Sequence, residues 1–183
     1  MNVIKVELEG PLILEPKIFK DDRGQFVETF HQPRYAALGI GPFLQDNWSS
    51  SKKGVLRGLH FQHPRSQGKL VMVTRGAAWD VIVDVRNGSP SFGKSVNVEL
   101  TQTNGRQFWI PPGFAHGFVA LVDDTEVFYK CTEVYSPEDE RSLHWADPEL
   151  GLRWPVSAPR VSSKDQRAPR LKDVTELPVW GAR

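Results

Sequence analysis

Cysteine is almost absent from this chain, which holds only Cys131 among its 183 residues. A single cysteine cannot form an internal disulfide, and it excludes a zinc cluster built from several thiolates. We therefore expect the packing of side chains to hold the fold together.

Long apolar runs and a surplus of either charge are also missing. Charged residues and prolines interrupt every apolar stretch in residues 1–20, so we expect neither a signal peptide nor a membrane-spanning helix there. The net charge is +1 and both signs are interspersed, which argues against a surface for nucleic acid or a membrane. We expect a cytoplasmic protein that binds neither and that meets any anionic ligand with local side chains.

Helical periodicity is scarce, whereas the two-residue alternation of β-strands recurs. In residues 95–101, Val96, Val98 and Leu100 alternate with polar residues, as in a strand with one buried face. Further strands are expected at residues 12–18, 25–30, 44–49, 55–61, 69–75, 78–85, 106–110, 117–122 and 125–131. Many short strands separated by Gly, Pro, Asn and Asp predict an all-β sandwich or barrel.

We expect residues 1–183 to form one domain, because the chain has no internal repeat and no low-complexity linker. Short helices are expected at residues 33–38, in a turn after Ser136 that this serine caps, and at residues 163–168. The tail from Trp154 onward is rich in proline and charge. It is expected to wrap the core rather than add to it.

Two histidines stand in strand-like segments, His60 in RGLHFQ and His116 in PPGFAHGF. Both segments resemble the cupin signature, which implies a jelly-roll barrel with histidines pointing inward. Metal-binding cupins have a second histidine two positions after the first and a glutamate soon after it. Here Gln62 takes the histidine's place, and no glutamate lies between His63 and Arg75. Two of four ligands predict a site without metal, although each histidine alone could be a hydrogen-bonded core residue.

A metal-free pocket suits proton transfer next to a carbonyl group. Such a reaction needs a base, a group that stabilises the enolate oxygen and, for inversion, an acid on the opposite face. His60 is the candidate base, and Lys69, on the apolar face of its strand, is the candidate for the oxygen. Tyr129 alternates with apolar neighbours in EVFYKC, so its phenol is directed inward as the candidate acid. The alternative is a lysine at the rim and an ordinary core tyrosine.

Several motifs occur in order along the chain: RGLHFQ, GKLV followed by WDVIVDVR, PPGFAHGF, YKCTEVYSP, LHWADPELGLRWP and SSKD. Together, from about Gly10 to Asp165, they resemble the dTDP-4-dehydrorhamnose 3,5-epimerase family. The resemblance implies a metal-independent epimerase of dTDP-rhamnose biosynthesis that needs no cofactor. Its substrate would be a dTDP-4-keto-6-deoxy sugar nucleotide, with C3 and C5 of dTDP-4-dehydro-6-deoxy-D-glucose inverted to give dTDP-4-dehydro-L-rhamnose.

The resemblance also implies the roles of individual residues. His60 matches the base, Asp165 in SSKD its carboxylate partner, Lys69 the group near the C4 keto oxygen, and Tyr129 the acid. The substrate-binding residues that it implies are Arg23, Arg57 and Lys164 at the diphosphate, Phe26, Glu28, Gln45, Asn47 and Tyr135 around the thymidine, and His116 within the pocket.

One detail conflicts with a regular strand. Strict alternation through VLRGLHFQ places Arg57 and His60 on opposite faces. Either Gly58 marks a bulge, or Arg57 reaches the substrate from the strand end or across a subunit boundary. Members of this family are typically homodimers whose N-terminal strands cross to the neighbour, and the alternation of residues 2–10, which otherwise form an unprotected edge, agrees with a homodimer.

Three alternative functions remain open. Related enzymes with the same motifs epimerise only C3 or only C5 of such a substrate. A metal-dependent cupin is disfavoured by the missing histidine and glutamate. A non-catalytic sugar-nucleotide-binding cupin would not need His60, Lys69 and Tyr129 together.

Overall fold

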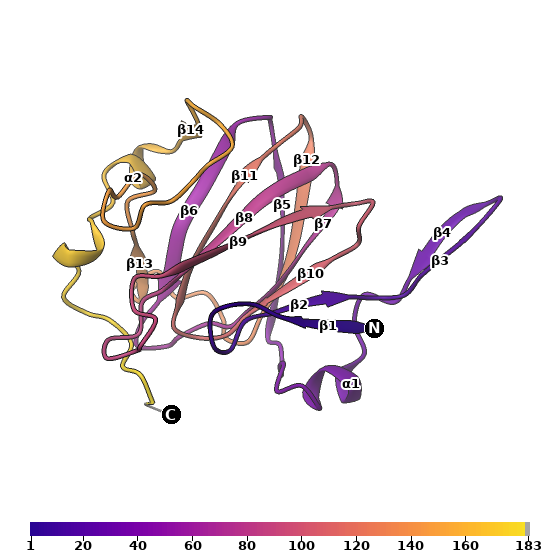
Figure 1. Ribbon diagram of the computed structural model, residues 1–183, viewed down its shortest axis with the longest axis horizontal. Helices are drawn as coiled ribbons and strands as arrows, with labels where there is room; N and C mark the ends of the chain where they lie inside the picture. The colour runs from indigo at the N-terminus through magenta and orange to yellow at the C-terminus, as the bar shows by residue number, and fades with distance from the viewer. Residues whose placement is uncertain (182–183) are drawn as a thin grey trace.

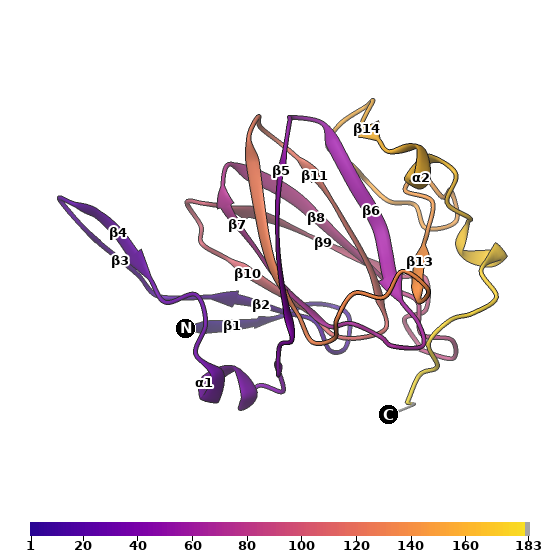
Figure 2. The same cartoon turned by 180° about the vertical axis from the view of Figure 1, so that it is seen from behind.

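Two β-sheets packed face to face make up the body of the computed structural model, which describes residues 1–181 (Figures 1 and 2). The first sheet is antiparallel and has the order β1 (Asn2–Lys5), β2 (Leu12–Glu15), β10 (Gln107–Ile110), β7 (Lys69–Arg75), β12 (Thr125–Cys131) and β5 (Gln45–Ser51). The second has the order β13 (Glu140–Ser142), β6 (Val55–Gln62), β11 (Phe114–Ala120), β8 (Ala77–Asp84) and β9 (Ser95–Thr101), with β14 (Arg160–Val161) parallel to β6.

Apolar side chains that alternate along the strands fill the space between the sheets. Val71 and Val73 of β7 meet Ile82 of β8 there, and Phe108 and Val127 are fully buried beside them. Burying each such side chain contributes about 1.5–3 kcal/mol. The shared core fixes the distance between the two sheets, and with it the width of the cavities that open between them.

The outer faces of both sheets are covered by non-strand segments. The segment around α1 (Gln32–Ala36) packs Tyr35 and Ile40 against the first sheet. The C-terminal tail, drawn in yellow in Figure 1, runs over the second sheet and buries Leu171 of the 3-10 helix η1 (Leu171–Asp173). Within residues 1–181, no helix has the length and apolar character needed to span a membrane.

The all-β architecture predicted from the sequence is confirmed, and three predicted strands, at residues 69–75, 95–101 and 125–131, have the same bounds in the structure. The tail was predicted only to wrap the core. In the structure it also extends the second sheet through β14 and adds Leu171 to a buried apolar cluster. The turn after Ser136 is not helical, and the Ser136 hydroxyl accepts a hydrogen bond from Arg65 instead of capping a helix. The predicted helix at residues 163–168 is the short α2 (Ser163–Gln166), capped by Ser162.

A hairpin formed by β3 (Ile18–Asp21) and β4 (Gly24–Val27) projects away from the body in both views (Figures 1 and 2). The predicted strands 12–18 and 25–30 include only Ile18 and residues 25–27 of this hairpin, so most of β3 was not predicted. Two aromatic side chains on the hairpin, Phe19 and Phe26, are 51% and 66% exposed. The two rings lie against each other, with centroids 6.4 Å apart, yet most of their surface has no cover from the body of the chain.

A bulge in β6 resolves the conflict between Arg57 and His60. His60 is paired with His116 of β11, whereas Arg57 is paired with Phe118, so two residues of β6, Gly58 and Leu59, oppose the single Gly117 of β11. Gly58, in this extra step, has φ +111°, and a Cβ there would lie 2.6 Å from the carbonyl oxygen of His116. The glycine and the bulge together turn Arg57 and His60 toward the same cavity.

Candidate active site

Two adjoining cavities open between the sheets, of about 190 and 380 Å³. His60 of β6, Lys69 of β7 and Tyr129 of β12 line both of them. The strand alternation that points Lys69 and Tyr129 to the interior was predicted and is confirmed, because both side chains share their faces with core residues. The three groups proposed for proton transfer thus surround one space.

His60 is paired with a buried carboxylate from the distant tail. Its Nε2 lies 2.6 Å from Oδ1 of Asp165 in α2, and the Asp165 side chain is only 5% exposed. Burial acts to raise the pKa of Asp165, but the hydrogen bond and charge of His60, with Ser162 and the backbone N–H of Gly58, hold that pKa below its usual value. Because Asp165 stays ionised and occupies Nε2, Nδ1 is the nitrogen left to accept a proton.

Lys69 brings an ammonium group into this enclosed space. Burial lowers the pKa of Lys69, and the nearby carboxylates of Asp80 and Glu140 act against this shift. A cation in a water-poor cavity interacts strongly with a negative charge that develops beside it. Lys69 is therefore suited to stabilise an oxyanion.

Tyr129 stands on the neighbouring strand with its ring against the core. Burial raises the pKa of Tyr129, the charges of Cys131 and Glu140 raise it further, and Arg57 acts in the opposite direction. The phenol therefore keeps its proton at neutral pH and can donate it.

His116, expected within the pocket, lines the larger cavity and is held by a second carboxylate. Its Nε2 lies 2.9 Å from Oδ2 of Asp80, and both side chains are buried. Burial raises the pKa of Asp80, while His116 and Lys69 act to lower it. His116 thus lines the cavity beside Lys69, and the fully buried Asp80 holds its imidazole.

Three of the residues expected to bind substrate lie at the smaller cavity: Gln45, Asn47 and Tyr135. Gln45 accepts a hydrogen bond from the backbone N–H of Tyr135 at 2.7 Å and donates one to Asn47 at 3.0 Å. These planar amides and the half-exposed Tyr135 ring offer hydrogen bonds and stacking to a flat polar ligand.

Cationic side chains line the larger cavity, and a carboxylate of the smaller cavity contacts one of them. Arg57 and Lys164, both expected at a diphosphate, line it together. The Arg57 Nε donates to the hydroxyl of Ser51 at 3.0 Å, and Lys164 forms an ion pair with Glu140. Glu140 also accepts a hydrogen bond from the Tyr135 hydroxyl at 2.9 Å. Glu140, which lines the smaller cavity, therefore connects it to Lys164 of the larger one.

The remaining expected residues, Arg23, Phe26 and Glu28, do not reach these cavities within the chain. Arg23 and Phe26 lie on the projecting hairpin, where Arg23 pairs with Asp21. Glu28 pairs with Arg34 of α1 at 2.7 Å. Their part in substrate binding stays a prediction that needs a second chain.

Asp80 and Glu140 were not predicted as site residues. Asp80 carried a signal, because in WDVIVDVR it alternates with Ala78 and Ile82 on the face that proves to be the core. A carboxylate on an apolar strand face needs a buried partner. Glu140 carried no such signal, because β13 has only three residues and shows no periodicity.

Metal ligation is a separate question. Each of the two inward histidines, His60 and His116, is bonded to its own carboxylate. In the described part of the chain, no group of three or more His, Cys, Asp or Glu side chains is placed to hold a metal ion.

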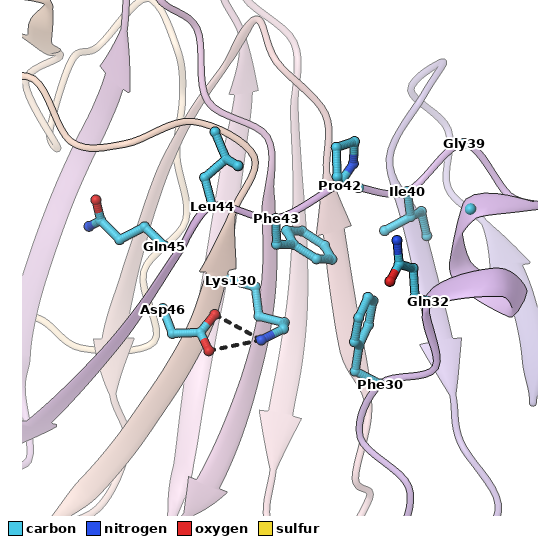
Figure 3. Close-up of a pocket in the computed structure, with 12 residues that line it drawn as sticks. Phe30, Gln32, Gly39, Ile40, Pro42, Phe43, Leu44, Gln45, Asp46 and Lys130 are labelled. Carbon is cyan, nitrogen blue, oxygen red and sulfur yellow. Dashed lines mark hydrogen bonds and ion pairs between the residues drawn. The ribbon is translucent and has the colours of Figure 1, made fainter.

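A third cavity, of about 660 Å³, lies beside α1 and away from the reacting groups (Figure 3). Figure 3 shows Lys130 paired with Asp46 in it, at 2.8 Å, near the rings of Phe30 and Phe43. It shares only Gln45 with the two site cavities. It contains no base or acid set like that around His60, so the chemistry belongs to the smaller spaces.

Comparison with known proteins gives one consistent family. The family model described as dTDP-4-dehydrorhamnose 3,5-epimerase matches residues 5–173. The dTDP-4-dehydrorhamnose 3,5-epimerase of Shigella flexneri is 49% identical over 176 residues, which cover 94% of this chain and 97% of that protein.

Solved structures agree. The dTDP-6-deoxy-D-glucose-3,5-epimerase of Legionella pneumophila, in complex with dTDP-4-keto-L-rhamnose, is 48% identical with a TM-score of 0.96 over 99% of each chain. A 3'-monoepimerase from Streptomyces bikiniensis, in complex with dTDP-quinovose, is 35% identical with a TM-score of 0.90, over 96% of this chain and 92% of that one. This likeness confirms the cupin-like jelly roll predicted from the sequence.

Proposed function

Because this chain belongs to the dTDP-4-dehydrorhamnose 3,5-epimerase family, we propose that it is an isomerase acting on dTDP-4-dehydro-6-deoxy-D-glucose. It inverts C3 and C5 and gives dTDP-4-dehydro-L-rhamnose. The observation that carries the proposal is the set of His60 with Asp165, Lys69 and Tyr129 around one space. Its location in the cytoplasm stays a prediction from the sequence.

In the proposed mechanism, Nδ1 of His60 removes the proton from C3 or C5. The C–H bonding electrons move into the ring to form an enolate whose oxygen is the former C4 ketone. Asp165 stabilises the imidazolium that results, through its 2.6 Å contact with Nε2. The Lys69 ammonium stabilises the enolate oxygen.

The proton returns from the other side of the sugar ring. Tyr129 donates its phenolic proton to the carbon, the ketone re-forms and the configuration is inverted. The tyrosinate then takes a proton from solvent, and His60 releases one. The raised pKa of Tyr129 supports this role, because a group that donates a proton must first hold it at neutral pH.

The substrate spans both cavities in this proposal. Its thymidine lies with Gln45, Asn47 and Tyr135, and its sugar lies among the reacting groups. Arg57 and Lys164 meet the diphosphate, where guanidinium and ammonium groups suit phosphate oxygens. Substrate would then compete with Glu140 for Lys164.

We also propose a homodimer in which the β3–β4 hairpin of one copy reaches the site of the other. The hairpin projects from the body, with the rings of Phe19 and Phe26 exposed (Figure 1). Arg23 and Glu28, which the family resemblance assigns to the substrate, lie on or beside it. A second copy would bring them to a nucleotide that their own chain holds too far away.

The test is proton exchange during turnover in deuterated water. The enzyme is expected to place deuterium at both C3 and C5 of dTDP-4-dehydro-6-deoxy-D-glucose, measured by NMR and mass spectrometry. Label at neither carbon would refute the proposal.

Two variants separate the base from the acid. His60→Ala is expected to lower exchange at both carbons by about 10²–10⁴-fold, since it removes the general base. Tyr129→Phe should keep part of the exchange while net inversion falls. Equal loss of exchange and inversion in Tyr129→Phe would contradict separate roles.

An epimerase of C3 alone or of C5 alone is the second candidate function. It is supported by the 3'-monoepimerase that has the same fold and is 35% identical to this chain. Deuterium at a single carbon, with a product inverted only there, would establish it. A metal-dependent activity would instead be lost on treatment with a chelator and restored by metal.

A further inference from the structure

Ser49 has a buried hydroxyl with no hydrogen-bond partner. Within residues 1–181, its Oγ is the one buried side-chain polar atom left unpaired. Leaving a buried hydroxyl unpaired is unfavourable, because the group gives up its hydrogen bonds to water, and most such atoms in proteins are satisfied. The cost is offset if a ligand supplies the missing partner.

The surroundings of Ser49 point to the occupant of the larger cavity. Ser49 lies on the inward face of β5 and lines that cavity with His60, Lys69 and Tyr129. Its inward-facing neighbour Ser51 already has a partner, since its hydroxyl accepts from Arg57. Ser49 alone of these two hydroxyls is free to bind a ligand.

The hydroxyl is screened from water in the free protein, but Ser49 itself lines the cavity, so we expect a turn about χ1 to bring Oγ to a ligand there. Serine has three staggered rotamers, and no hydrogen bond holds Oγ in its present one. A ligand that fills the cavity can therefore capture Oγ without moving the backbone of β5.

We propose that Ser49 is a substrate-positioning residue that hydrogen-bonds a ring hydroxyl of the hexose. The proposal rests on the sugar-nucleotide substrate argued above and assigns one more residue to its sugar. The cations Arg57 and Lys164 serve the phosphates, and the amides of Gln45 and Asn47 line the other cavity. A hydroxyl that both donates and accepts is the natural partner for a sugar hydroxyl among the reacting groups.

The experiment compares dTDP-glucose, an unreactive analogue, with dTDP by titration calorimetry on the wild-type protein and on Ser49→Ala. The variant is expected to bind dTDP-glucose about three- to tenfold more weakly, the loss of one neutral hydrogen bond. Its affinity for dTDP should not change, because dTDP has no hexose. Ser50→Ala, with its hydroxyl on the exposed face of β5, is the matched control and should bind both ligands as the wild type does.

Thermal melting of the ligand-free variants distinguishes a serine that binds ligand from a serine that stabilises the fold. Removing an unpaired hydroxyl should leave the melting temperature unchanged or raise it. A Ser49→Ala protein with wild-type affinity for dTDP-glucose would overturn the proposal, as would equal weakening of both ligands or a lowered melting temperature. If the wild-type protein bound neither ligand, the proposed function itself would fail.

Discussion

At the scale of single residues, the protonation of Lys69 and Tyr129 sets the pH range of the proposed reaction. Both must hold their protons for the enolate to be stabilised and then reprotonated. Burial shifts their pKa values in opposite directions, downward for Lys69 and upward for Tyr129. The charge of Glu140 raises both, and the pKa of Glu140 itself is lowered by Lys164 and Tyr135 against the effect of burial.

The Glu140→Gln variant tests this arrangement. Without the negative charge, the pKa values of Lys69 and Tyr129 both fall, so each group loses its proton at a lower pH. The alkaline limb of the kcat/KM profile is therefore expected to move to lower pH, measured with a coupled assay across the neutral and alkaline range. Glu138→Gln is the control, because Glu138 is an exposed carboxylate outside both cavities. An unchanged limb in Glu140→Gln would mean that another group governs it.

Whether the inward direction of a site residue could be predicted from the sequence depended on the length and the alternation of its strand. Lys69 and Tyr129 stand on seven-residue strands whose alternation fixes the inward face. Ser49 lies on an equally long strand, but QDNWSSS has polar residues on both faces and gives no inward signal. The pairing of His60 with Asp165 came from family resemblance, because local periodicity says nothing about contacts between distant segments.

At the scale of elements, the bulge in β6 decides whether Arg57 and His60 share a cavity. Gly58→Ala would press a Cβ against the backbone of His116 and Gly117, at 2.6 and 2.7 Å, in a positive-φ conformation. We expect it to lower the free energy of unfolding by about 2–4 kcal/mol, measured by urea denaturation, and to abolish most activity.

Gly54 offers the matched control for this prediction. It also has a positive φ, +79°, but a Cβ there would meet nothing within 4 Å. Gly54→Ala should cost about 1–2 kcal/mol and retain activity. Equal effects of the two substitutions would show that the close approach to β11 is unimportant.

Strands that were predicted well have a clear pattern and clear ends. Residues 69–75 lie between Gly68 and Gly76, for example. Among the strands missed are β13 and β14, with three and two residues, whose pairing depends on β6 alone. Such short strands carry no period of their own, so only the tertiary contact defines them.

At the scale of the whole molecule, the projecting hairpin predicts that two chains share each site. Mixing two inactive variants tests it, one carrying His60→Ala and the other Arg23→Ala with Phe26→Ala. In a mixed dimer, the intact His60 of one chain would face the intact hairpin of the other. After unfolding and refolding together at equal amounts, about one quarter of the sites should be active, if the chains pair at random into twofold dimers.

The result distinguishes the two ways a hairpin could serve a site. If each hairpin served its own chain, both sites of a mixed dimer would lack one part and activity would not return. Wild-type protein mixed with His60→Ala provides the reference for random pairing. The mass of the refolded species, from light scattering, checks that dimers form.

The contact between His60 and Asp165 joins residues 105 positions apart, and this has a consequence for synthesis in the cell. Once residue 142 has emerged from the ribosome, the nascent chain contains every strand of both sheets except β14. The imidazole of His60 would still lack the carboxylate of Asp165. The order of translation thus leaves His60 without its partner until the tail docks, so we expect a ribosome stalled between residues 142 and 165 to display a chain that lacks the His60–Asp165 pair and is inactive.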